Sequence, residues 1–248
     1  MIKYFDEKGI IEPVQNERLP DGINATTAVT AFSDFLFNEL IERYNAKKVC
    51  SVVGGVDRPV YAIERDGKHI VAYKSPVGAP AAAMVMEEVG MLGIKNFIAF
   101  GICGALTETP FRTLIVPDKA FRDEGTSYHY LPPADYITLK NAGRVSEFLK
   151  GLKVNAVTGG TWCTDGFYRE TRTRMEQMKA QGCIAVDMES SALQAVCDFR
   201  DKNFYTFFIT ADSLAGEKWE SNDILNLSVT SVDKVAVSAA VEMGFKLN

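Results

Sequence analysis

Residues 204–213 have the sequence FYTFFITADS, in which a run of apolar and β-branched side chains stops at a short polar segment. Such a run predicts a buried strand over residues 204–210. A second buried strand is predicted over residues 96–100 (NFIAF), and residues 101–104 (GICG) follow it directly as a small-residue turn. Ligands of open α/β sheets bind at the carboxyl ends of strands, so both segments are places to look for a site.

Strand-like and helix-like periodicity alternates outward from these two strands. Further strands are predicted at residues 49–53, 60–64, 70–75, 114–116 and 154–159, with an Asp66-Gly67 hairpin turn between the second and third of these. Helices are predicted at residues 32–44, capped by Ser33 or Thr30, and at 81–92, 135–150, 171–181, 189–200 and 229–243. This alternation predicts a single α/β domain over residues 1–248, with a central mixed β-sheet flanked by helices in three layers and an irregular N-terminal segment over residues 1–28.

Composition excludes several classes of protein. The 248 residues are 47% hydrophobic and 24% charged, which is the composition of a globular protein with a large core. A net charge of −5 with scattered Lys and Arg argues against a nucleic-acid partner, and the sequence contains no uncharged apolar run of about 20 residues that would cross a membrane. Two histidines and the absence of a CxxC pair argue against a metal site, and five cysteines without a secretory leader favour the cytoplasm.

Asp212 is the first candidate for chemistry, because it follows a predicted buried strand and places a carboxylate at the edge of the sheet. A carboxyl group there can act as an acid or base. Asp and Ser are also favoured as helix or turn caps, and the spacing alone leaves that alternative open.

Asp187, Met188 and Glu189 form the second candidate, at a predicted junction between a strand and a helix. Two carboxylates can accept hydrogen bonds from sugar hydroxyls, and a methionine can pack on the face of a ribose. The alternative is structural, since acidic residues stabilise the first turn of a helix and methionine is common in cores.

Two weaker signals accompany these candidates. Residues 122–130 (RDEGTSYHY) are dense in polar and aromatic groups, which favours a functional loop over a glycine turn with surface aromatics. The small-residue turns predicted at residues 75–80 and 101–104 would let a ligand approach the backbone closely, or serve close packing alone.

Together these segments resemble the nucleoside phosphorylase I family, which includes purine nucleoside phosphorylases, uridine phosphorylases and methylthioadenosine nucleosidases. The resemblance covers most of the chain from about Asp66 onward. The segments that carry it are residues 66–68 (DGK), 76–80 (PVGAP), 101–105 (GICGA), 164–170 (TDGFYRE) and 186–190 (VDMES), with Asp212 at the position of the catalytic aspartate of the purine enzymes.

The resemblance implies a role for each matching residue. Asp212 would stabilise the leaving base as the catalytic residue, and the ribose would be held by Asp187, Met188 and Glu189. Phe167 would stack on the base, with Arg169 or Arg172 reaching its polar edge, and Arg58, Gly101, Ile102 and Cys103 would form the phosphate site. Asp187 replaces the glutamate that is usual in the family, which shortens the reach of the carboxylate by one methylene.

The resemblance implies a nucleoside and phosphate as substrates, no cofactor and no metal, and a homo-oligomer that is a dimer or a hexamer built as a trimer of dimers. Two departures affect the phosphate site. The arginine of the family's N-terminal G-D-P-x-R loop is missing from residues 30–34, and Ala99 stands where a second arginine is usual. Arg58, expected to cross a subunit interface, or Arg122 would have to rebuild the site.

Three functions therefore remain open from the sequence. The first is a phosphorylase that cleaves the N-glycosidic bond of a purine nucleoside, or of purine and pyrimidine nucleosides alike, to give free base and ribose 1-phosphate. The second is a nucleosidase in which water replaces phosphate. The third is a nucleoside-binding protein without turnover, which the presence of Asp212 disfavours because a binder needs no leaving-group acid.

Overall fold

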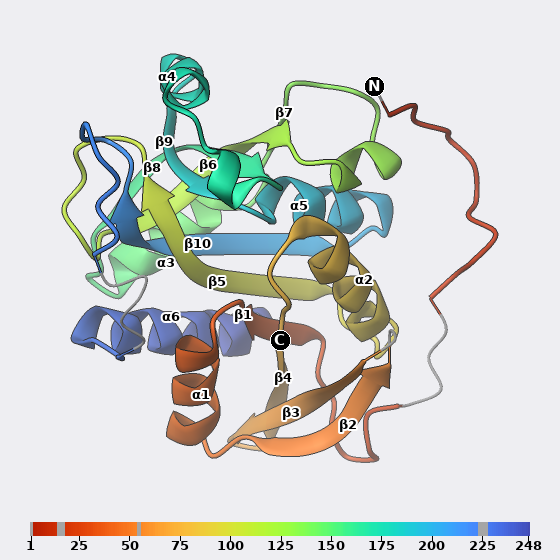
Figure 1. The fold of residues 1–248 in the computed structure, drawn as a ribbon. Coiled ribbons are helices and arrows are strands. Elements are labelled where there is room, and N and C mark those ends of the chain that lie inside the picture. The colour runs from red at the N-terminus through yellow and green to blue at the C-terminus, as the bar shows by residue number, and fades with distance from the viewer. Residues whose placement is uncertain (1, 14–17, 54–55, 223–227) are drawn as a thin grey trace.

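The computed structural model describes residues 2–13, 18–53, 56–222 and 228–248, and within them strands and helices alternate along the chain (Figure 1). The strands are β1 (Thr27–Ala31), β2 (Lys47–Val53), β3 (Asp57–Arg65), β4 (Lys68–Lys74), β5 (Asn96–Ala105), β6 (Leu114–Asp123), β7 (Tyr136–Thr138), β8 (Ala156–Thr164), β9 (Cys183–Asp187) and β10 (Asn203–Ser213). The helices are α1 (Asp34–Arg43), α2 (Ala79–Gly90), α3 (Ala142–Gly151), α4 (Arg172–Ala180), α5 (Ser190–Phe199) and α6 (Ser231–Leu247), with 3₁₀ turns η1 (Thr126–His129) and η2 (Phe167–Arg169).

All of these strands belong to one mixed sheet. Its order is β10-β6-β8-β9-β5-β1-β4-β3-β2, with β7 on the side of β6. Strand β10 also pairs in parallel with β5, so that β5, β9, β8, β6 and β10 close into a ring while β1 to β4 extend the sheet beyond it. The predicted α/β domain with a mixed sheet is confirmed.

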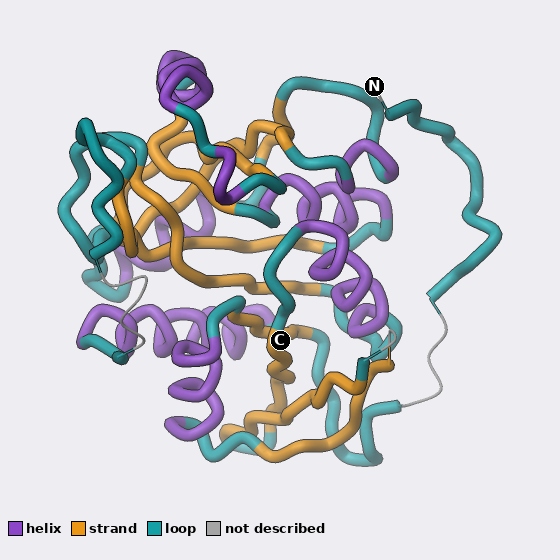
Figure 2. The backbone as a smooth tube through the Cα atoms, viewed as in Figure 1, coloured by secondary structure: helices purple, strands orange, loops and turns teal. Residues whose placement is uncertain are grey.

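Helices cover both faces of the sheet (Figure 2). Strand β5 shows why its sequence is apolar throughout: Ile98 and Phe100 pack in a core cluster with α1, α3 and α6, whereas Phe97 and Ala99 pack in a second cluster with α2 and α5. A strand that is covered on both faces needs a continuous apolar run rather than an alternating one. No helix in the described part of the chain is long and apolar enough to cross a membrane.

Most predicted elements are confirmed with small changes of boundary, and the hairpin between β3 and β4 turns at Asp66 and Gly67 with φ of 53° and 75°. Three expectations about boundaries and caps are wrong. The irregular segment predicted over residues 1–28 overlaps β1, and Thr30 is a buried strand residue rather than a helix cap, its hydroxyl donating to the carbonyl of Tyr73 at 2.8 Å. The helix predicted over residues 135–150 begins only at Ala142, after the short strand β7.

The small-residue segment at residues 101–104 is not a turn, because β5 continues through it to Ala105. Its glycines serve close packing inside the strand. A Cβ at Gly101 would lie 2.8 Å from the ring of Phe32, and one at Gly104 would lie 2.8 Å from the side chain of Val186. The sequence pattern did not predict that the strand continues here, because glycine has a low strand propensity.

Candidate active site

A cavity of about 390 Å³ opens where β5, β9 and β10 end beside the loop that follows β8. The cavity brings together seven of the site residues predicted from the sequence: Ile102, Cys103, Phe167, Asp187, Met188, Glu189 and Asp212. The remaining residues of its lining are Phe32, Ser33, Val77, Gly104, Tyr168, Glu170 and Val186. A mostly apolar cavity with a few converging polar groups is the usual form of a small-molecule site.

Asp212 reaches this cavity because β10 contains an irregularity. The pairing of β10 with β5 shifts between Thr210 and Asp212, so that Thr210 lies opposite Cys103 while Asp212 lies opposite Gly104. An extra residue in a strand re-aims the side chains that follow it. The missing side chain of Gly104 leaves room there, since a Cβ would come within 3.3 Å of Asp212 Oδ1.

The carboxyl group of Asp212 is buried, and burial raises its pKa, partly offset by a hydrogen bond from the indole of Trp219. Trp219 Nε1 donates to Asp212 Oδ2 at 2.7 Å. Nearby, burial and the charge of Asp212 raise the pKa of Glu170 to about 7. For both acids the shift favours the protonated form, which is the form that a proton donor needs.

Glu189 lies at the other polar end of the lining, immediately before α5. Its side chain is buried, and its Oε1 accepts a hydrogen bond from the backbone N–H of Gly78 at 2.6 Å. Burial, and then the charge of Asp187, raise the pKa of Glu189 to about 8. One oxygen of this group is thus anchored to the loop before α2.

Asp187 is surrounded by donors from its own junction between β9 and α5. Its Oδ2 accepts the backbone N–H of Glu189 at 2.9 Å and both the N–H and the hydroxyl of Ser190 at 2.7 Å. Its Oδ1 accepts the hydroxyl of Thr161 at 2.9 Å. The shorter side chain at this position therefore organises the loop that carries Met188 and Glu189.

Four residues predicted for the base or the phosphate lie outside the cavity lining. Arg172 donates to the carbonyls of Leu214, Gly216 and Glu217, and the side chain of Arg169 is exposed on η2. Arg58 is half-buried on β3 beside Glu88 of α2, where its charge lowers the pKa of Glu88 against the larger effect of burial. Gly101 packs against Phe32, whose ring lines the cavity, without lining it itself.

Arg122 does not take part in this site either. It is buried at the end of β6, where its guanidinium donates to Ser127 Oγ at 2.9 Å and to the carbonyls of Pro132 and Leu131 at 2.6 and 3.3 Å. Glu124 completes the network by accepting the hydroxyl of Ser191 on α5 at 2.9 Å. The polar density of residues 122–130 is thus explained by a buried network that fixes this segment to α5.

Sequence reasoning missed Glu170 and Trp219. Glu170 lies in the segment of residues 164–170, in which Phe167 and Arg169 drew the attention. The raised pKa of Glu170 depends on its burial beside Asp212, which the sequence does not show. Trp219 follows Asp212 by seven residues along an irregular loop, and no periodicity connects the two. The contact forms only because the loop turns back on β10.

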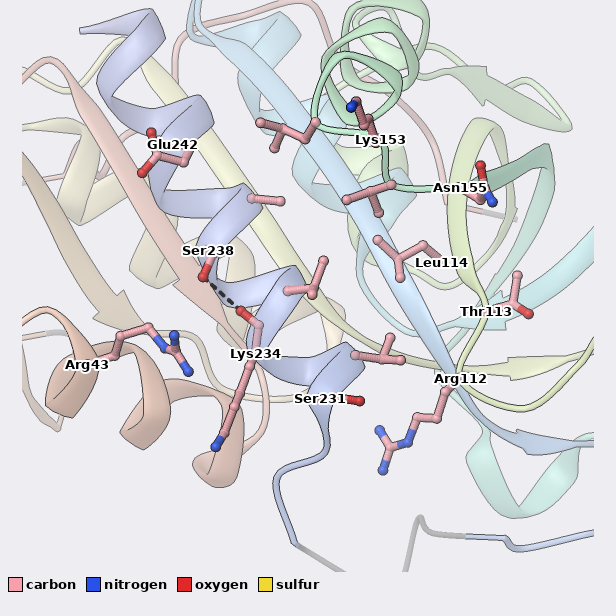
Figure 3. Close-up of a pocket in the computed structure, with 15 residues that line it drawn as sticks. Arg43, Arg112, Thr113, Leu114, Lys153, Asn155, Ser231, Lys234, Ser238 and Glu242 are labelled. Carbon is pink, nitrogen blue, oxygen red and sulfur yellow. Dashed lines mark hydrogen bonds between the residues drawn. The ribbon is translucent and has the colours of Figure 1, made fainter.

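A larger hollow of about 780 Å³ lies elsewhere, between α6 and the segment that leads into β8 (Figure 3). Arg112 in its lining forms an ion pair with the buried carboxylate of Asp233 at 2.8 Å, and Arg43 lies on α1 at its other side. None of the site residues predicted from the sequence lines this hollow. The cavity around Asp212 and Glu189 is therefore the candidate active site.

Comparison with known proteins identifies the family of the chain. The profile of the phosphorylase superfamily matches residues 26–242, which include every residue of the cavity lining. The chain belongs to the phosphorylase superfamily.

Individual relatives of this phosphorylase-superfamily chain are distant. It is 25% identical over 185 residues to a purine nucleoside phosphorylase DeoD-type of Aliivibrio fischeri, covering 73% of this chain and 77% of the relative. It is 24% identical over 184 residues to a purine nucleoside phosphorylase DeoD-type of Bacillus cereus, covering 71% and 77%. It is 27% identical over 166 residues to the uncharacterized protein R802 of Acanthamoeba polyphaga mimivirus, covering 65% and 64%.

Proposed function

We propose that this phosphorylase-superfamily chain cleaves the N-glycosidic bond of purine nucleosides and transfers the ribose to phosphate. The observation that carries the proposal is that Asp212, Phe167, Met188 and Glu189 line one cavity. They supply an acid, an aromatic face, a thioether and a buried carboxylate. The names of the relatives from Aliivibrio fischeri and Bacillus cereus support the same reaction.

Asp212 and Glu189 have different roles, because opposite charges develop on the base and on the ribose. Breaking the bond between ribose C1′ and the purine nitrogen leaves positive charge on the sugar and an electron pair on the base. Protonated Asp212 gives its proton to N7 of the purine and neutralises the leaving base. Glu189, anchored through Oε1 to Gly78, forms hydrogen bonds with the ribose hydroxyls through its other oxygen, and a phosphate oxygen forms the new bond to C1′.

Phosphate needs a cation that this cavity does not have by itself. No Arg, Lys or His is among the described residues that line it. We therefore propose that a second copy of the chain completes the site in a homo-oligomer, with Arg58 as the contributed cation. Its half-buried position on β3, outside its own cavity, is compatible with a role in a neighbour's site.

The same observation favours a second candidate, which is hydrolysis. Without a cation in its described lining, the cavity gives phosphate no group that balances its charge, whereas a neutral water needs none. In this case a water oxygen forms the bond to C1′, and the products are free base and ribose. Asp212 and Glu189 keep their roles in both reactions.

The deciding experiment measures base release from inosine, adenosine and uridine by the purified protein, with and without phosphate, and follows ribose 1-phosphate separately. Release of purine that requires phosphate and yields ribose 1-phosphate supports the phosphorylase. Equal release in phosphate-free buffer supports the hydrolase. Binding of nucleosides without any release would overturn both and leave a nucleoside-binding protein.

A further inference from the structure

The chain that follows β10 folds back on the strand as a closed loop. Ser213 and Glu220 exchange two backbone hydrogen bonds, each of 2.9 Å, and so close residues 214–219 into a loop beside the cavity. The N–H of Leu214 also donates to the carbonyl of Ala105 at the end of β5, at 2.9 Å. The base of this loop is thus fixed to the two strands that carry Asp212 and Gly104.

Arg172 holds the outer part of the same loop. Its guanidinium donates to the carbonyls of Leu214 at 3.0 Å, Gly216 at 2.6 Å and Glu217 at 3.1 Å. The planar fork of an arginine is suited to several acceptors at fixed angles, so three carbonyls on one guanidinium define the path of the backbone. The next residues of this path bring Trp219 back to Asp212.

Trp219 is placed unusually for a large aromatic residue. Its side chain stays 50% exposed, yet Nε1 donates to the buried Oδ2 of Asp212 at 2.7 Å. Half-exposed tryptophan gains little from packing, so the specific feature of this position is the hydrogen bond. It fixes one oxygen of Asp212 and leaves Oδ1 on the side of Gly104, which lines the cavity.

We propose that Trp219 is the positioning residue for Asp212, and that Arg172 acts on the reaction indirectly by holding the loop that carries Trp219. The proposal rests on the proposed function, because positioning matters only if Asp212 protonates a leaving base. In this proposal Arg172 does not recognise the base directly, but holds the backbone of the loop in place. With Oδ2 held, the proton of Asp212 resides on Oδ1 and points to the substrate.

The first test does not depend on activity. The chain contains two tryptophans, so labelling with 5-fluorotryptophan gives two fluorine NMR signals, and Trp219→Phe assigns them. We expect the Trp219 signal to move with pH in the unmodified sequence and to lose the main part of this movement in Asp212→Asn. A Trp219 signal that is the same with Asp or Asn at position 212, at every pH, would overturn the contact.

Other charged or titratable groups near this pair must be separated from Asp212. They are Cys103, Glu108, Glu170, Arg172, Asp187, Glu189, Glu217 and Glu220. Glu170→Gln is the matched control, since burial and Asp212 raise the pKa of Glu170 to about 7 and its titration falls in the range of the experiment. Movement that survives in Glu170→Gln and disappears in Asp212→Asn belongs to Asp212.

The second test measures the pH profile of kcat for Trp219→Phe beside Lys218→Gln, which changes the exposed neighbour in the same loop. We expect Trp219→Phe to lower kcat about 10- to 100-fold, as for the loss of a hydrogen bond to a charged group. Because the indole stabilises ionised Asp212, its removal raises the pKa of Asp212, and the decline of activity at high pH should move to higher pH. Lys218→Gln should change neither quantity.

The outcomes distinguish this proposal from the proposed function. A lowered kcat with an unmoved pH profile would mean that Trp219 has a structural role only, and unchanged kcat would overturn the positioning role. Thermal denaturation of both variants identifies any loss of folding. If the unmodified protein releases no base from any nucleoside, the proposed function fails, while the fluorine spectra still decide whether Trp219 holds Asp212.

Discussion

The backbone N–H of Gly78 donates to Glu189 Oε1 at 2.6 Å, and this contact joins the start of α2 to the start of α5 across the cavity. Gly78 has φ of 97°, a conformation that side chains other than glycine rarely adopt. The glycine therefore serves the position of a carboxylate that is 111 residues away in the sequence. The position of the Glu189 side chain and the local backbone conformation at Gly78 are coupled at this point.

Gly78→Ala should weaken nucleoside binding together with stability. A Cβ meets no atom within 4 Å, so the penalty comes from the backbone, of about 1 kcal/mol, and from displacement of the N–H that holds Glu189. Isothermal titration with a nucleoside and thermal denaturation measure the two effects. Gly143→Ala, at an open helical position without the positive φ, is the control and should bind as the unmodified protein does. Equal affinity of Gly78→Ala would show that the contact does not position Glu189.

The stability of the protein without ligand should fall as pH rises from about 4.5 to 8. Glu189 has a folded-state pKa of about 8 against an ordinary value of 4.5, so over this interval the folded state keeps a proton that the unfolded state has lost. The free energy of unfolding then decreases by at most about 1.4 kcal/mol per pH unit for this proton. Below the lower value the contribution is constant.

Glu189→Gln should make this dependence shallower, as measured by urea denaturation at several pH values. Glu147→Gln, on the exposed face of α3, should leave it unchanged. The slope does not vanish in Glu189→Gln because burial raises the pKa values of Glu170, Asp187 and Asp212 as well. An identical slope for both variants would contradict a protonated Glu189.

Asp212→Asn should lower the turnover of purine nucleosides about 10²- to 10⁴-fold, which is the range for loss of a general acid. The amide oxygen of asparagine can still accept the indole N–H of Trp219, so nucleoside affinity should change little. Rapid-quench measurement of base release and equilibrium dialysis separate the two quantities. Normal turnover in this variant would remove Asp212 from the reaction.

Asp187→Asn should destabilise the protein more than it affects the chemistry. The carboxylate accepts four hydrogen bonds, three of them at Oδ2, and an amide NH₂ group at that place would face donors. Each buried donor left without an acceptor costs about 1–3 kcal/mol. Denaturation measures the loss, with Asp118→Asn on the exposed side of β6 as control. A fully stable variant with weak ribose binding would instead make Asp187 a direct ligand.

The sequence predicted most of the sheet and half of the cavity lining, because these parts follow from local pattern. Apolar runs identified β5 and β10, and the residues that end or follow them, such as Asp212 and Cys103, reach the cavity as parallel strands require. Met188 and Glu189 were found by their position at a strand-to-helix junction. These features depend on residues that are adjacent in the sequence.

What the sequence did not reveal depends on contacts between distant segments. Arg172 and Arg122 lie close in the sequence to predicted site residues. In the fold, however, both guanidinium groups donate to backbone carbonyls elsewhere in the chain. Strand β5 continues through Gly101, and the reason for a glycine there is that the ring of Phe32 fills the space that a side chain would need. Charge and residue type predict which groups could bind a ligand, whereas their partners in the fold decide which of them face it.

The pairing of β5 also bears on the order in which the protein matures during synthesis. Residues of β5 pair with β1, which is made earlier, but also with β9 and β10, which leave the ribosome some 80 to 110 residues later. The ring of strands therefore closes only after β10 has been made. Nascent chains that stop before residue 203 contain Glu189 but neither β10 nor Asp212, so the candidate site is assembled only in a late step.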